Sequence, residues 1–186
     1  MQSDRDAVAR TLWLAFRDDP LWRWAFPDHD GLAELWRFLV GSALRYPWVW
    51  LVGSYQAAAV WIPPGGSELT AEEEDHLEPL LRDLLGARAS SVLALFERFE
   101  DAHPRDREHY YLSLLGTHPD HRGTGIGMAL LADNLARIDA EGSPAYLESS
   151  NPLNDRRYER IGFERIGEFS TPDGAHTVST MWREPR

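Results

Sequence analysis

The chain has 186 residues, of which 43% are hydrophobic and 26% are charged. This length suits one domain with a substantial core, so we expect residues 1–186 to form a single domain. The formal net charge of −11 disfavours binding to nucleic acid or to an anionic membrane and favours a cationic partner. Cysteine is absent, which excludes disulfides and cysteine-ligated zinc.

The first residues do not resemble a secretory signal, because Asp4 and Asp6 occupy the place of a basic segment. No apolar run approaches the roughly 20 residues of a membrane-spanning helix. We therefore expect a cytoplasmic protein without membrane contact. All 19 basic residues are arginine, so no lysine is present for self-acetylation or Schiff-base chemistry.

Apolar residues at three- and four-residue spacing predict four helices in the first half of the chain. They cover about residues 4–17, 31–45, 70–86 and 92–100. Two β-type runs, 48–52 and 57–62, are separated by Gly53–Gln56, which predicts a hairpin. Thr70 and Glu73 have the spacing of a capping box at the start of the third helix.

Residues 18–28 lie between the first two helices, and we expect a loop there because two prolines bracket a group of aromatic side chains. Large aromatic side chains both line pockets and close cores. Trp22, Trp24 and Phe26 are therefore candidate substrate-binding residues, and the alternative is that they only cover the core beneath the loop.

The second half of the chain is organised around an apolar strand, residues 109–117, that leads into a glycine-rich turn and a helix. Gly123, Gly125 and Gly127 let the backbone turn without a Cβ, so that successive N–H groups and the helix dipole can face an anion. The turn lacks the Gly-Lys-Ser/Thr of a P-loop and the spacing of a dinucleotide-binding fingerprint. It indicates either another phosphate-bearing ligand or a turn without a ligand.

Three further strands complete the expected sheet. A strand at residues 144–150 is expected to lie parallel to the central strand, because a helical crossover connects the two. A short polar helix should follow at 151–160, and residues 163–169 and 176–181 should pair as a hairpin around the turn signal at 171–174. The pattern predicts a mixed α/β (α+β) fold.

Two motifs resemble the GCN5-related N-acetyltransferase (GNAT) superfamily. The first has the pattern Arg-x-x-Gly-x-Gly and runs from Arg122 to Gly127. The second, from Glu148 to Phe163, reads Glu-x-Ser-x-Pro-x-Asn, then Tyr-Glu-Arg, then Gly-Phe. Together with the Pro-Asp-His before the turn, the motifs are most similar to puromycin N-acetyltransferase-like actinobacterial members, over about residues 105–183.

The resemblance implies the GNAT fold, a mixed central sheet flanked by helices, with parallel strands that splay apart around Leu115 and Glu148. One departure is plain, because the family begins with a strand and this chain opens on the predicted first helix. Either that strand is absent, which would expose a sheet edge, or the true start lies further upstream.

The resemblance also implies acetyl-CoA as the acetyl donor. Backbone groups around Leu115 and Thr117 would bind the pantetheine arm, the glycine-rich turn would bind the pyrophosphate, and Tyr158 would lie by the thioester sulfur. The implied cofactor-binding residues are Leu115, Gly116, Thr117, Arg122, Gly123, Thr124, Gly125, Ile126, Gly127, Asn154 and Tyr158. No metal is expected, since no histidines and carboxylates have ligand spacing.

Acetyl transfer needs a neutral amine and a proton for the leaving thiolate. Tyr158 is the candidate acid, because a phenol can donate to a thiolate, and its alternative role is packing at a helix end. Glu148 is the candidate base and substrate ligand, because an interior carboxylate is costly unless it takes part in chemistry or has a partner. The alternative is that Glu148 makes only a structural hydrogen bond. Tyr111 and Ser113 share a strand face and could relay a proton or orient the amine.

These residues predict an enzyme, an N-acetyltransferase that acetylates the primary amine of a small, antibiotic- or aminonucleoside-like molecule by direct attack in a ternary complex. An antibiotic-resistance role would follow from that substrate class. One alternative is acetylation of a protein N-terminus or lysine. Another is a non-catalytic acyl-CoA-binding module, against which Tyr158 and Glu148 both argue. A monomer or a homodimer is expected.

Overall fold

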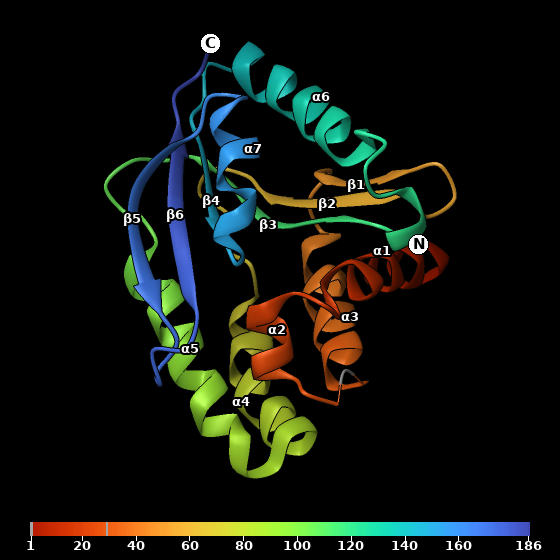
Figure 1. The fold of residues 1–186 in the computed structure, drawn as a ribbon, viewed down its shortest axis with the longest axis vertical. Coiled ribbons are helices and arrows are strands. Elements are labelled where there is room, and N and C mark those ends of the chain that lie inside the picture. The colour runs from red at the N-terminus through yellow and green to blue at the C-terminus, as the bar shows by residue number, and fades with distance from the viewer. Residues whose placement is uncertain (1, 29) are drawn as a thin grey trace.

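The computed structural model describes residues 2–28 and 30–186, and the elements follow one another as Figure 1 shows. The helices of four or more residues are α1 (Gln2–Phe16), α2 (Pro20–Ala25), α3 (Asp30–Ala43), α4 (Ala71–Leu85), α5 (Ala89–Ala102), α6 (Ile126–Ala140) and α7 (Asp155–Glu159). The strands are β1 (Val49–Val52), β2 (Ala57–Ile62), β3 (Tyr110–Thr117), β4 (Ala145–Ser149), β5 (Glu164–Ser170) and β6 (Thr177–Arg183).

The strands form one mixed sheet in the order β1-β2-β3-β4-β6-β5. Every neighbouring pair is antiparallel except β3 and β4, which are parallel through the α6 crossover. Their pairing is short, from Tyr110 opposite Ala145 to Leu112 opposite Leu147. Beyond that point, no described strand pairs with the β4-facing edge of β3, so the expected splay of the parallel strands is confirmed.

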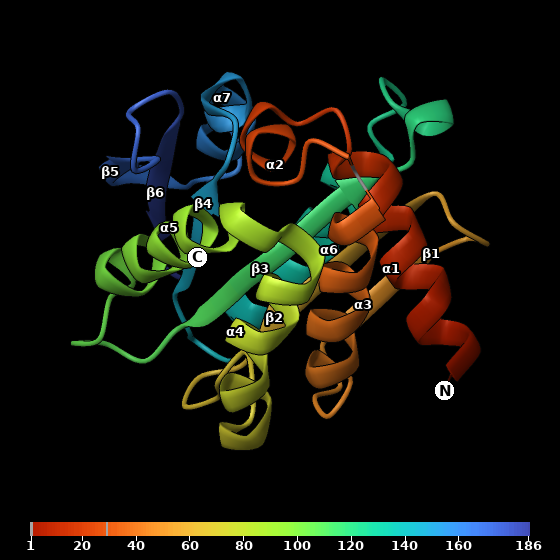
Figure 2. The same ribbon diagram turned by 90° about the horizontal axis from the view of Figure 1, so that it is seen from below.

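Helices cover both faces of the sheet. Figures 1 and 2 show α6 on one face and α1, α3, α4 and α5 on the other. A buried hydrogen bond ties α6 to the sheet, because Trp61 Nε1 on β2 donates to Asn134 Oδ1 on α6 at 2.9 Å. None of the described helices has the length and the apolar composition needed to cross a bilayer.

Two glycines allow close packing around the end of β3. A Cβ at Gly116 would lie 2.7 Å from Ala15 Cβ, so the lack of a side chain lets α1 rest directly on the strand. A Cβ at Gly127 would lie 2.2 Å from Thr117 Oγ1, so the first turn of α6 packs equally closely. Both distances are far below van der Waals contact, and larger residues at these positions would displace a helix.

The predicted helices and strands are present with small differences at their ends. The capping box at the start of α4 is confirmed, since Glu73 N–H donates to Thr70 Oγ1 at 3.3 Å and Thr70 N–H donates to Glu73 Oε2 at 2.9 Å. The helix continues through Pro79.

The prediction of a loop over residues 18–28 is wrong for its central part, which forms α2. Asp19 Oδ1 caps this helix by accepting from the N–H groups of Leu21 at 3.0 Å and Trp22 at 3.3 Å, and Pro20 occupies the first turn. A helix of six residues is too short to show the apolar periodicity that reveals a longer one.

Candidate active site

A cavity of about 740 Å³ opens where β3 and β4 separate. Strand residues, α2, α5, α7 and the loop between β2 and α4 all contribute to its walls. Acidic and aromatic side chains are among the residues that line it. Its size is that of pockets which enclose drug-sized molecules.

The glycine-rich turn has the form of an anion cradle. Gly123 and Gly125 adopt φ angles of +78° and +83°, and a Cβ on either would meet nothing within 4 Å. Gly125 is the N-cap of α6 and offers no side chain to the free N–H groups of the first helical turn. The open space and these donors fit the pyrophosphate of acetyl-CoA.

The side chains of Arg122 and Thr124 in the turn make hydrogen bonds to backbone oxygens of the protein itself. Arg122 is exposed, and its Nη2 donates to the backbone oxygen of Ala15 at 2.8 Å, so its guanidinium is anchored on the end of α1. Thr124 Oγ1 donates to His121 O at 2.7 Å. Contact between Arg122 and a phosphate remains a prediction.

The separated strands fit the remainder of the implied cofactor. Leu115 and Asn154 line the cavity, together with Ser149 and Ser150 at the end of β4. Between β3 and β4 the backbone groups at the β3 edge lack a strand partner in the described part of the chain, so an extended amide-bearing arm can bind there like an added strand. The roles assigned to Leu115, Gly116 and Thr117 remain predictions that this geometry supports.

Tyr158 also lines the cavity, and its ring packs edge-on against Phe163 with 6.1 Å between centroids. Burial, followed by the charges of Asp155 and Asp19, raises the pKa of the Tyr158 hydroxyl to about 12, against the opposing charge of Arg157. The hydroxyl therefore keeps its proton at neutral pH and is available as a donor.

Two carboxylates line the cavity, that of Glu148 nearly fully buried and that of Glu68 half-buried. Glu148 follows Leu147 at the point where the strands separate, its side chain is only 2% exposed, and its Oε1 has no hydrogen-bond partner in the described structure. Glu68, from the loop between β2 and α4, accepts a hydrogen bond from Ser113 Oγ. Ser113 is the residue after Leu112, so both carboxylates are held where β3 and β4 part.

Two titratable groups that line the cavity, Glu68 and Tyr111, have raised pKa values. Burial raises the pKa of Glu68, the Ser113 hydrogen bond opposes this shift, and the charges of Glu148 and Glu100 add to it, so that the pKa lies at about 7. Burial, followed by the charges of Glu148 and Glu68, raises the pKa of the Tyr111 hydroxyl well above its ordinary value. Tyr111 thus stays protonated, whereas Glu68 exchanges its proton near neutral pH.

Of the three aromatic residues proposed for substrate binding, Trp22 alone is among the residues that line the cavity. It packs against Trp36 at 4.7 Å and stacks on Phe99 at 6.4 Å between centroids. Phe26 is 1% exposed and belongs to the core. The alternative role, closing the core, is the one the structure assigns to Phe26.

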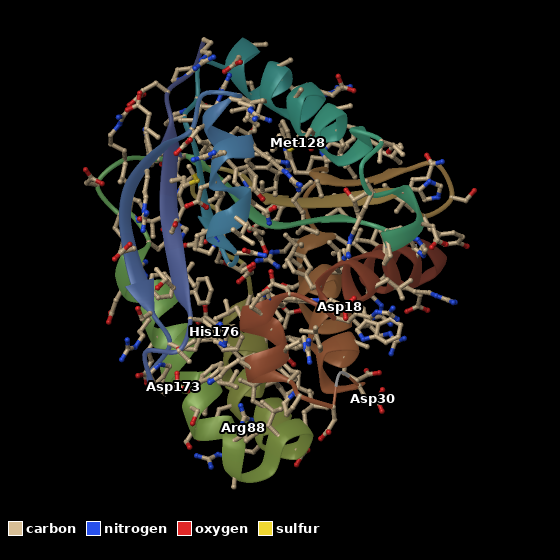
Figure 3. All side chains as sticks on the ribbon, in the orientation of Figure 1. Asp18, Asp30, Arg88, Met128, Asp173 and His176 are labelled. Carbon is tan, nitrogen blue, oxygen red and sulfur yellow. The ribbon has the colours of Figure 1, made fainter. Side chains whose placement is uncertain are left out.

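Trp24 is turned away from the cavity because α2 is helical and not extended. Residues two apart in a helix point in nearly opposite directions, whereas in a strand they share a face. Trp24 Nε1 donates to Asp173 Oδ2 in the β5–β6 turn at 2.7 Å, and the Arg88 guanidinium lies 5.8 Å from the Trp24 ring. Figure 3 labels Asp173 and Arg88 in this region, close to α2.

Sequence reasoning missed Glu68 and His103. Glu68 lies in a proline- and glycine-containing connector and is 45 positions from Ser113 in the chain. His103 lies just after α5 in what reads as a short polar connection, yet its Nδ1 is 3.7 Å from Glu148 Oε1. Neither residue belongs to a local motif, so only the folded arrangement reveals it. Among the described residues, no group of three or more His, Cys, Asp or Glu side chains is placed to hold a metal.

Comparison with known proteins agrees with this geometry. Residues 102–181 match the family model described as acetyltransferase (GNAT) domain. This stretch of the chain is therefore similar to a GNAT acetyltransferase domain. It contains the glycine-rich turn, both separated strands and Tyr158.

Solved structures share the fold over nearly the whole chain. A histone acetyltransferase HPA2 and related acetyltransferase from Corynebacterium glutamicum is 24% identical with a TM-score of 0.67, over 100% of this chain and 93% of that one. The polyamine N-acetyltransferase of Drosophila melanogaster is 18% identical with a TM-score of 0.64, and the match covers 98% of this chain and 96% of that one. Arylalkylamine N-acetyltransferase 2 from Aedes aegypti is 15% identical with a TM-score of 0.71, and the match covers 100% of this chain and 96% of that one. The domain match and the shared fold support an acyltransferase enzyme.

The anion cradle can be tested with two matched glycine variants. Gly125 and Gly142 both have positive φ, +83° and +66°, and a Cβ at either meets nothing within 4 Å, so alanine imposes similar backbone strain at both. Gly125→Ala should weaken acetyl-CoA binding at least tenfold by calorimetry, because its methyl group occupies the space assigned to the pyrophosphate. Gly142→Ala, at the other end of α6, should bind as the parent does. Equal affinities for the two variants would contradict the cradle.

The raised pKa of Glu68 predicts a pH dependence of stability. Because folding raises this pKa from 4.5 to about 7, the folded chain retains a proton that the unfolded chain releases between these values. The free energy of unfolding should fall by roughly 3 kcal/mol as the pH rises through this window. Glu68→Gln, which still accepts from Ser113, should remove this fall in urea denaturation. The exposed Glu164→Gln should retain it, and a Glu68→Gln profile like the parent's would refute the assignment.

Proposed function

We propose that the chain transfers an acetyl group from acetyl-CoA to the primary amine of a small cationic molecule, by direct attack in a ternary complex. The observation that carries this proposal is the pair of carboxylates, Glu68 and Glu148, at the point where the cofactor cleft between β3 and β4 ends. Neither carboxylate has an arginine partner among the described residues, so a bound ammonium would supply the missing positive charge.

The two carboxylates have different roles in this mechanism. Glu68 is engaged by Ser113 and holds the amine in place, whereas the free Oε1 of Glu148 accepts the proton that the ammonium must lose before it can attack. Bound acetyl-CoA supplies an acetyl thioester as the electrophile. Tyr158, protonated at neutral pH, donates to the departing thiolate and recovers its proton from solvent.

A small acceptor is favoured over a protein. The two carboxylates line a cavity with walls from α2, α5 and both parallel strands, and a cavity of this size suits a compact molecule better than a polypeptide. The names of two structural neighbours specify polyamine and arylalkylamine acceptors. The same reaction on an aminonucleoside antibiotic would give a resistance function, and a cytoplasmic location would supply the acetyl-CoA.

The proposal is tested by measuring thiol release from acetyl-CoA with a panel of amines. The panel should contain agmatine, spermidine, an arylalkylamine, puromycin and a peptide with a free N-terminus. We expect turnover with at least one small cationic amine and little with the peptide. Turnover with the peptide alone would favour the protein-acetylating alternative. Cofactor binding without turnover of any amine would favour an acyl-CoA-binding module.

The role of Tyr158 predicts a specific loss of turnover. Tyr158→Phe keeps the ring that packs on Phe163 and removes only the hydroxyl. Turnover should fall roughly 10²- to 10⁴-fold, as for loss of a general acid, while acetyl-CoA affinity and melting temperature change little. Tyr55→Phe, at an exposed position between β1 and β2, is the control and should retain full activity. Parental turnover in Tyr158→Phe would show that another group protonates the thiolate.

A further inference from the structure

The buried carboxylate of Glu148 has a histidine pair beside it that the mechanism above does not use. His103 Nδ1 lies 3.7 Å from Glu148 Oε1, the oxygen without a hydrogen-bond partner. On its other side, His103 Nε2 lies 3.1 Å from His109 Nε2. The His103 side chain is 24% exposed, whereas that of Glu148 is 2% exposed. The histidine thus connects a nearly dry carboxylate with solvent.

The hydrogen bonds determine where the protons of this pair lie. His109 Nδ1 is 2.8 Å from the backbone oxygen of Arg107, which only accepts, so this nitrogen carries a proton. Burial lowers the pKa of His109, which keeps the ring neutral and leaves its Nε2 as an acceptor. His103 Nε2 must then donate to His109 Nε2. In neutral His103, the Nδ1 lone pair therefore faces Glu148.

We propose that His103 takes the substrate proton from Glu148 and releases it to solvent, and that His109 is a positioning residue that fixes the required tautomer of His103. This inference rests on the proposed function, because it assigns a path to the proton that acetylation of an ammonium must remove.

The proton balance is simple. The N–H bond of the ammonium breaks as an O–H bond forms on Glu148; this O–H bond then breaks as His103 Nδ1 gains the proton and becomes an imidazolium. The 3.7 Å separation exceeds a hydrogen bond, so the transfer uses one water or a small rotation of the imidazole. His103 returns to neutral by losing the Nδ1 proton to bulk water, and Glu148 is again a base.

The surroundings hold His103 in this place. Tyr111 of β3 and Tyr146 of β4 contact its ring edge-on at 4.8 Å and 5.0 Å between centroids. The Tyr146 hydroxyl donates to Ala102 O at 3.3 Å. The charged and titratable groups that face His103 are therefore Glu148, Tyr111, Tyr146, His109 and, through its charge, Glu68.

The first test measures the histidines directly and does not require turnover. Nitrogen-15 NMR of the full chain should show His109 protonated on Nδ1 and neutral His103 protonated on Nε2. In Glu148→Gln, the nitrogen-15 signal of His103 Nδ1 should move, because the carboxylate oxygen beside it is replaced by a neutral amide. Protonation of neutral His103 on Nδ1, or a His103 Nδ1 signal unchanged by Glu148→Gln, would overturn the proposal.

The second test uses kinetics with an amine that the parent enzyme acetylates. His103→Gln can still donate to His109 through its amide but cannot take a proton. Its kcat should fall about 10²-fold, at the lower end of general acid-base effects, with the KM for acetyl-CoA unchanged. The pH dependence of kcat should change, and added imidazole should restore part of the rate. His76→Gln, on the exposed side of α4, should match the parent.

The outcomes separate the two proposals. A parent chain that acetylates no amine contradicts the proposed function, and the NMR measurement then still decides whether Glu148 and His103 are coupled. An active parent whose His103→Gln variant keeps the full rate and the same pH profile contradicts the relay alone.

Discussion

The site depends on the early end of pairing between β3 and β4. Three residue pairs hold the strands together, up to Leu112 and Leu147, and the next residues, Ser113 and Glu148, flank the opening. The same separation leaves backbone donors and acceptors of β3 without a strand partner in the described part of the chain, and it places acidic side chains nearby. In the proposed mechanism, one topological feature thus serves both the acetyl donor and the amine.

Holding two carboxylates in this opening destabilises the fold. A buried carboxylate without a cationic partner is costly, and Glu68 reduces this cost through its hydrogen bond from Ser113 and by remaining partly protonated near neutral pH. Glu148 is nearly fully buried and keeps one oxygen free. Such groups persist where the surrounding structure is stable enough to carry them, here the two apolar cores on either side of the sheet. Their presence is best understood as a requirement of chemistry rather than of folding.

Sequence alone predicted what local patterns determine. Periodicity and turn chemistry located every strand, and the motif around Gly125 located the start of α6. The helix α2 was missed because it has only six residues, and with it the opposite directions of Trp22 and Trp24. Glu68 and His103 contact partners that only the tertiary fold brings close, so no sequence pattern marks them.

The rigid seating of α6 has a thermodynamic consequence for ligand binding. Gly127 allows the first turn of α6 to pack on Thr117, and Asn134 accepts a hydrogen bond from Trp61. Folding itself therefore fixes the position of α6 and of its N-terminal N–H donors. The conformational entropy of ordering these donors is lost before any anion arrives. A phosphate that binds there meets a preorganised cradle, and its affinity reflects desolvation and charge rather than the ordering of a loop.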